Sequence, residues 1–169
     1  MGLFPPAPGG GELVANGYKG KGALIHLIVE AHGRPIAITS SAANGDERKQ
    51  VEGLLKQIGS KHLRSAKRKR GMIVLEADKG YDCQWLRDQL LSKRIFPLIP
   101  WRKNRMGPCL KAVRKAFNLK NLRWQVERSF AWIKRKCRRI VLRWERKMSC
   151  WLAFTTLALI DYWLEILVR

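Results

Sequence analysis

Two acidic residues stand out in a chain where acids are scarce, because 34 lysines and arginines face only 13 aspartates and glutamates. Asp78 follows the apolar run 72–77, which predicts a strand buried on both faces, and Gly80 lets the backbone turn sharply after it. Open α/β sheets place their sites at the carboxyl ends of such strands. Asp78 is therefore a candidate site residue; a turn or helix N-cap aspartate is the alternative that spacing alone leaves open.

The second acid, Glu127, lies in a predicted helix whose apolar stripe runs from residue 122 to residue 140. Arg123 precedes it by four residues, and Lys134 and Arg138 follow it by seven and eleven. At about 100° per residue, these four side chains fall within roughly 60° of one another on the helix. An ordinary surface ion pair is the simpler interpretation, and helix geometry alone favours it.

Taken together, two carboxylates on different elements among many cations predict a divalent metal site that works on phosphates. Hard Mg²⁺ takes oxygen ligands, and a two-metal site for phosphoryl transfer usually uses three or more carboxylates. Two are one short, and the histidines, which lack metal-ligand spacing, are expected to be structural or solvated: His26, His32 and His62.

The net charge of +21 points to a polyanionic partner, with nucleic acid first. Three basic runs occur at 61–70, 102–105 and 134–147, and a solvated charged face explains one such run better than three. We assign these cations to phosphates, including Arg102 and Lys103 in the second run, and we add Lys79 beside Asp78. Base stacking and internal packing both remain open for four interleaved tryptophans: Trp101, Trp124, Trp132 and Trp144.

The elements that position these residues are those of an α/β domain. A Pro- and Gly-rich segment, 1–17, predicts an irregular start, and runs at 23–29 and 36–40 predict a hairpin. A helix ending at Gly59 follows, and then a strand, helix and parallel strand at 72–77, 82–91 and 95–99. The segment from 100 to about 118 reads as a basic loop.

The last predicted helix, at about 148–167, contains only 13 consecutive uncharged residues before Asp161. A bilayer needs about 20, and Glu165 interrupts the rest, so we expect a core helix and no membrane partner. Four cysteines without a CxxC pair and the absence of a signal-peptide pattern indicate reduced thiols in the cytoplasm. The apolar side chains expected to pack in the core are Trp151, Phe154, Leu157 and Ile160.

Four motifs, taken together, are specific: Ala-Asp-Lys-Gly-Tyr-Asp at 77–82, Ile-Pro-Trp-Arg-Lys-Asn at 99–104, Arg123 with Val-Glu-Arg at 126–128, Phe130 and Ile-Lys at 133–134, and Ala-Phe with Leu-Ala within 153–158. With them the chain resembles the DDE transposases of bacterial insertion sequences, in particular family five and its four-like relatives. The resemblance covers about residues 18–166.

This resemblance implies a ribonuclease-H-like core with a central mixed sheet and a helical C-terminal part, filling 18–169. It implies an enzyme that cuts and rejoins DNA ends with Mg²⁺ or Mn²⁺. Asp78 would be the second acidic ligand and Glu127 the third, while Arg123 and Lys134 would contact DNA near the scissile phosphate.

The sequence departs from the family pattern at two places. The tyrosine that leads the family signature falls at Lys120, and the phrase Asp-Gly-x-Phe, which carries the first acid, reads Met1-Gly2-Leu3-Phe4. We therefore expect a partial or second-frame transposase, incomplete at its N-terminus, that forms a homo-oligomer or joins an upstream-frame product. It would act on double-stranded DNA in the bacterial nucleoid. The alternative is a non-enzymatic basic DNA-binding protein or a truncated regulator of transposition.

Overall fold

The computed structural model describes residues 2–59, 63, 71–102, 110–116 and 124–168. It divides the chain into two compact units. The first unit combines Met1–Gln57 with Trp124–Arg169, and the second is Ile58–Arg123. Each unit is considered by itself.

The first unit is built on the predicted hairpin, which is formed by β3 (Gly20–Val29) and β4 (Pro35–Ala42). The two strands are antiparallel, in the register that sets Ile25 opposite Ser40. Two short strands, β1 (Gly2–Leu3) and β2 (Ala15–Gly17), also pair antiparallel with β3. The N-terminal stretch is thus tied to β3 by both short strands and by a bridge between Pro6 and Gly22, a difference from the irregular start expected from its glycines and prolines.

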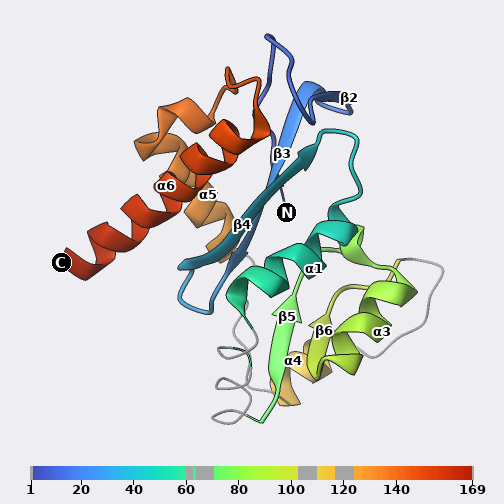
Figure 1. Ribbon diagram of the computed structural model, residues 1–169. Helices are drawn as coiled ribbons and strands as arrows, with labels where there is room; N and C mark the ends of the chain where they lie inside the picture. The colour runs from blue at the N-terminus through green and yellow to red at the C-terminus, as the bar shows by residue number, and fades with distance from the viewer. Residues whose placement is uncertain (1, 60–62, 64–70, 103–109, 117–123, 169) are drawn as a thin grey trace. The chain divides into compact units, whose positions relative to one another are not determined.

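One face of this hairpin carries the core of the first unit. Alternation along the strands turns Ile25, Leu27 and Ile38 toward α5 (Trp124–Lys136) and α6 (Met148–Val168). Figure 1 shows both helices on this side of the hairpin. The helices and the turn between them add Phe130, Ile133, Ile140, Trp151 and Ala158 to the cluster.

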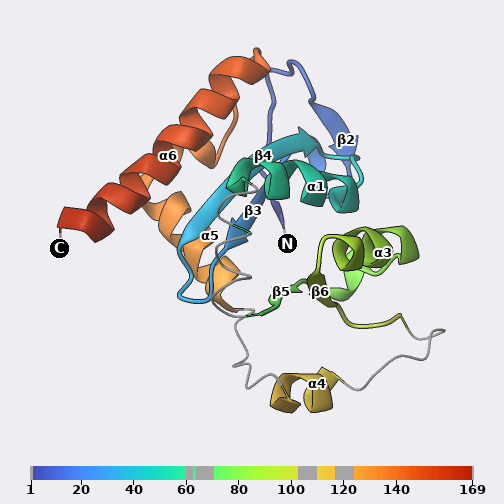
Figure 2. The ribbon, with the colours of Figure 1, turned by 60° about the horizontal axis from the view of Figure 1, so that its bottom comes forward.

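The opposite side of the hairpin faces α1 (Glu47–Ile58), as Figures 1 and 2 both show. Asp46 begins this helix, because its Oδ1 accepts a hydrogen bond from the Arg48 backbone N–H at 3.0 Å. On this side of the sheet His26, only 1% exposed, lies 2.8 Å through Nε2 from Ser41 Oγ.

Burial lowers the pKa of His26 from 6.5 to about 4, because a charged imidazole is costly to bury. Below pH 6.5 the unfolded chain binds a proton at this residue that the folded chain does not bind. We therefore expect the free energy of unfolding to fall by about 3 kcal/mol between pH 6.5 and pH 4 from this residue alone. Urea denaturation of wild type and His26→Gln will measure this pH-dependent difference. His32→Asn, at an exposed site, is the matched control, and an equal slope in wild type and His26→Gln would contradict the prediction.

The second unit contains the predicted strand, helix and strand. Its strands β5 (Ile73–Glu76) and β6 (Ile95–Leu98) are parallel, as expected, and α3 (Gln84–Ser92) connects them. A 3-10 turn, η1 (Lys79–Tyr81), precedes α3. One further helix, α4 (Leu110–Ala116), occurs where the sequence predicted only a loop.

The helix that carries Glu127 is shorter than predicted. α5 ends at Lys136 because Cys137 leaves the helical conformation, with φ −109° and ψ 70°. A 3-10 turn, η2 (Arg138–Ile140), follows and carries Ile140 into the core at 1% exposure. Arg138 therefore does not continue the face of α5, and the helical geometry assigned to it was wrong.

α6 differs from the expected core helix in which face it buries. Trp151, Thr155 and Ala158 are buried, whereas Leu157 is 57% exposed and Ile160 is 49% exposed. The helix is 21 residues long with a mean hydropathy of 1.5 in its most apolar window, enough in length and composition to cross a membrane. It packs on β4 of the first unit, however, so its inner face behaves as a core helix.

Candidate functional site

Asp78 lies two residues beyond the end of β5, at the carboxyl edge of the parallel pair, where the sequence placed it. Its Oδ1 accepts a hydrogen bond from the Gly80 backbone N–H at 2.8 Å, so the side chain caps η1. The N-cap interpretation of Asp78 thus accounts for only one of its two carboxylate oxygens. Oδ2 has no hydrogen bond among the described residues, and the side chain is partly exposed. One carboxylate oxygen is therefore available to a ligand.

A buried ion pair holds the loops at this same edge of the strands. Asp82, 4% exposed, accepts hydrogen bonds through Oδ1 from Arg87 Nε at 3.0 Å and Nη2 at 2.9 Å. Its Oδ2 accepts the Arg102 backbone N–H at 2.9 Å. Arg87 also donates to the Ile99 carbonyl at 2.9 Å and stacks 3.7 Å from the centre of the Trp101 ring. The loop after β5 is thereby tied to the loop after β6.

These contacts bear on Trp101, whose role the sequence left open, and they involve two residues that the sequence analysis did not single out. Trp101 is half-buried, and its ring packs against the guanidinium group of Arg87. The structure therefore shows this tryptophan in internal packing. Asp82 and Arg87 escaped sequence reasoning, because the third partner is a backbone N–H twenty residues farther along the chain. The only signal was a scarce acid at the start of a predicted helix with an arginine one turn inside it.

α4, the helix that sequence reasoning missed, is tied to β5. Arg114 on α4 forms an ion pair with Glu76, the last residue of β5. Glu76 lies two residues before Asp78, so side-chain alternation points both toward the same face of the strand and its continuation. A basic helix is thus attached beside the carboxyl edge that carries Asp78.

Glu127 is exposed on α5, and no hydrogen bond or ion pair links it to the described residues. Lys134, seven residues later, is also exposed on this helix. Seven residues are close to two full turns, so the two side chains lie on one face as predicted. The simple surface ion pair favoured by helix geometry requires Arg123, which lies outside the described residues.

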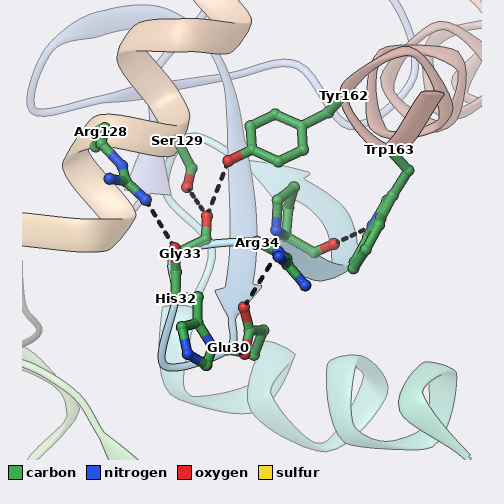
Figure 3. Close-up of polar contacts among 9 residues, drawn as sticks. Glu30, His32, Gly33, Arg34, Arg128, Ser129, Tyr162 and Trp163 are labelled. Atoms are coloured by element: carbon green, nitrogen blue, oxygen red, sulfur yellow. Dashed lines mark hydrogen bonds and ion pairs between the residues drawn. The ribbon is translucent and has the colours of Figure 1, made fainter. Parts of the chain in front are cut away.

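The turn between β3 and β4 holds α5 in place through the two residues that follow Glu127 (Figure 3). Arg128 Nη2 donates to the His32 carbonyl at 2.7 Å, and Ser129 Oγ donates to the Gly33 carbonyl at 2.7 Å. Tyr162 OH on α6 donates to the same Gly33 carbonyl at 3.2 Å.

Gly33 is needed in this turn, since its φ of +80° is left-handed and a β-carbon would lie 2.2 Å from Gln125 Oε1. The fold therefore fixes the position of Glu127 through its sequence neighbours while leaving its own carboxylate in solvent.

Four of the basic residues assigned to phosphates have exposed side chains: Lys79, Arg102, Lys134 and Arg138. Arg143 is an exception within the third basic run, because it is fully buried and donates to the backbone carbonyls of Glu12 at 2.7 Å and Glu145 at 2.9 Å. Burial lowers its pKa. Arg123, Lys103 and nearly all of the run 61–70 lie outside the described residues.

The two candidate carboxylates belong to different units, Asp78 to the second and Glu127 to the first. Their convergence therefore remains a prediction. In the described part of the chain, no group of three or more His, Cys, Asp or Glu side chains is placed to hold a metal ion. Trp124 and Trp144 are 50% and 60% exposed, so base stacking remains open for these two residues.

Comparison with known proteins identifies the family. A curated protein of Burkholderia cepacia named "Putative transposase for insertion sequence element IS402" is 31% identical over 137 residues. The match takes in 80% of this chain and 60% of that protein, so the chain spans less than two thirds of its relative's length. No solved structure matches the chain. The family model described as "Transposase DDE domain" matches residues 6–160, and the chain therefore belongs to the DDE transposase family of insertion sequences.

Proposed function

We propose that this chain is a catalytic portion of an insertion-sequence transposase that cuts and rejoins double-stranded DNA at the ends of its element. The observation that carries the proposal is the family match over residues 6–160, a stretch that includes both candidate carboxylates. The structure supports it with an Asp78 oxygen free of described partners and an exposed Glu127. The site would be a ribonuclease-H-like arrangement of these acids.

The donor set suits Mg²⁺ or Mn²⁺ in kind, because both side chains offer hard carboxylate oxygens. These two carboxylates are fewer than the three or more that two-metal phosphoryl-transfer sites usually have. Bound there, the metal would activate a water or a 3′ hydroxyl and offset negative charge on the scissile phosphate. Asp78 and Glu127 would hold it. The third acid would stand at the position of Met1, directly before β1.

The cations of the site would hold the DNA backbone. Lys134 shares the exposed face of Glu127, and Lys79 and Arg102 flank the loops at the Asp78 edge. Arg102 is oriented through its own backbone, because its N–H is fixed on the buried Asp82 while its side chain stays exposed. Such cations fix the position of the duplex and release counterions without reading its sequence.

Metal affinity tests the incomplete donor set. We expect weak Mn²⁺ binding by this chain and at least about tenfold tighter binding after Met1→Asp, carried behind an added initiating methionine, because a third carboxylate completes the shell. Electron paramagnetic resonance of free Mn²⁺ measures both affinities. Met1→Asn is the matched control, since it adds an amide of the same size without the charge. Equal Mn²⁺ affinities in the Asp and Asn variants would show that the side chain at position 1 is not a metal ligand.

DNA affinity tests the phosphate contacts. We expect log affinity for a duplex to fall with log salt with a slope of about −0.9 for each phosphate contact, and Lys134→Ala to reduce that slope by about 0.9. Lys56→Ala on α1, 74% exposed and paired with Glu52, is the matched control. Fluorescence anisotropy from 50 mM to about 300 mM salt measures both slopes. A salt-independent affinity would contradict the assignment of the basic runs to phosphate.

A non-enzymatic DNA-binding role, including that of a truncated transposition regulator, is the second candidate. It is favoured by the Asp78 hydrogen bond to Gly80, which is what a purely structural N-cap makes. This candidate predicts the same salt dependence of DNA binding but no metal-dependent cleavage. Cleavage by the variant that carries the third acid therefore separates the two.

A further inference from the structure

The short helix α4 has an inner and an outer side. Lys111 and Lys115 are exposed, whereas Val113 and Arg114 are half-buried. At about 100° per residue, the two lysines lie roughly 40° apart around the helix axis, and Val113 lies about 180° from the direction midway between them. The helix therefore turns Val113 toward its own unit and presents both lysines to solvent.

An ion pair fixes α4 to the sheet of the second unit. Arg114 binds the carboxylate of Glu76, and the two side chains are only 24% and 22% exposed. Figure 2 shows α3 and α4 on opposite sides of the β5–β6 pair. Because Glu76 is the last residue of β5, the ion pair joins α4 to the strand that leads into Asp78. Partial burial makes such a pair a firmer constraint than an ion pair in open solvent.

The charge of α4 selects the class of partner that its outer side can bind. Its seven residues contain three cations and no acid, and Glu76 offsets the charge of only one of them, Arg114. Among the described residues, no ion pair is formed by Lys111 or Lys115. The two lysines lie one helical turn apart, and their long side chains can each reach a phosphate of the same polyanion.

We infer that α4 is a DNA-contacting helix, and that the ion pair between Arg114 and Glu76 positions it. Lys111 and Lys115 contact phosphates of the duplex beside the candidate Asp78 site. Glu76 is a positioning residue that promotes the binding of a polyanion although it is negatively charged itself. The inference rests on the proposed function for the identity of the polyanion, DNA. If the ion pair only stabilises the second unit, its removal does not change the number of phosphate contacts.

Glu76→Gln tests the positioning role, because charge and position predict opposite results. The substitution raises the net charge of +21 by one, so long-range electrostatics alone predicts tighter binding of a duplex. We expect at least about tenfold weaker binding near 100 mM salt, and a salt slope smaller in magnitude by about 1.8, because two phosphate contacts are lost. Fluorescence anisotropy measures both. Asp88→Asn is the matched control, since it removes an exposed acid from α3 of the same unit, and it should bind at least as tightly as wild type.

The lysines themselves are tested without disturbing the ion pair. Lys111→Ala with Lys115→Ala should reduce the salt slope by about 1.8, whereas Lys49→Ala with Lys56→Ala, at two exposed positions of α1, should leave it unchanged. Adding Glu76→Gln to the α4 double variant should cause no further loss of affinity. The contacts that Glu76 positions are already absent from that protein, so the two effects are not additive.

An exchange of the two charges separates positioning from folding. Glu76→Arg with Arg114→Glu restores the ion pair at a net charge one lower than that of Glu76→Gln, and it should nevertheless bind the duplex more tightly. Urea denaturation of each variant shows whether the second unit stays folded. If the Glu76→Gln protein loses affinity only through unfolding, its loss adds fully to that of the lysine variant, and this result would overturn the inference.

Two further results would also overturn it: a Glu76→Gln protein that binds the duplex as tightly as Asp88→Asn, or an unchanged salt slope after Lys111→Ala with Lys115→Ala. Either result leaves the proposed function intact if wild type binds the duplex with a salt slope that Lys134→Ala reduces. Wild type that does not bind duplex DNA at all would instead contradict the proposed function and this inference together.

Discussion

Asp78→Ala and Glu127→Ala are each expected to reduce metal-dependent DNA cleavage at least about 100-fold in the protein that carries Met1→Asp behind an added methionine. Each substitution would remove one of the three oxygen donors of the proposed site. Neither removes a cation, so duplex affinity in the absence of metal should stay within about twofold of the parent protein. Cleavage of a labelled insertion-sequence end with Mn²⁺ measures the first effect, and anisotropy without metal measures the second.

Two acids supply matched controls for this experiment. Asp88→Asn lies in the second unit on α3, where Asp88 is exposed and accepts from Gln84 Nε2 at 2.8 Å. Glu52→Gln lies in the first unit on α1, paired with Lys56 at 3.3 Å. Both should cleave at the parental rate. If the Asp78→Ala and Glu127→Ala proteins cleave DNA as well as these controls, the two carboxylates are not catalytic. The non-enzymatic DNA-binding role would then be the better interpretation.

Much of the fold could be predicted because it follows from local sequence patterns. The hairpin and the parallel strand pair follow from apolar runs of strand length bounded by turn residues, such as His32-Gly33-Arg34-Pro35 between β3 and β4. Asp78 and Glu127 could be named as candidates for the same reason, since their surroundings in the sequence are unusual. The described strands form two sheets, so one central mixed sheet, with Glu127 on a helix packed against it, remains a prediction.

The predictions that were wrong depend on contacts between distant segments. α6 is apolar on every side, so its periodicity says little about which face is buried. The buried face of α6 is set by indole and phenol groups that donate hydrogen bonds to backbone and hydroxyl oxygens of the hairpin, as Trp151 does to Ser40. Likewise, α5 stops at Lys136 and a 3-10 turn carries Ile140 into the core, although Ile140 would also fit the apolar stripe of a longer helix.

The Asp82–Arg87 pair could not be read from the sequence, and it carries the largest stability effect that we expect. Both side chains are about 95% buried, and their charges are 2.9–3.0 Å apart at the closest atoms. Removing one partner takes the counter-charge away from a buried ion, which costs about 3–5 kcal/mol. Arg87→Met should therefore destabilise the second unit by that amount and free the loop that carries Arg102.

Arg48→Met is the matched control, because Arg48 pairs with Asp46 at 2.7 Å but both side chains are about a third exposed. Solvent screening reduces that loss to about 1 kcal/mol or less. Urea denaturation measures the free energies, and hydrogen exchange over residues 82–102 shows whether the loss is local to the second unit. Asp82→Ala combined with Arg87→Met should recover much of the stability lost in either single variant, since both buried charges are then removed together. Equal losses for Arg87→Met and Arg48→Met would show that the buried pair does not hold these loops together.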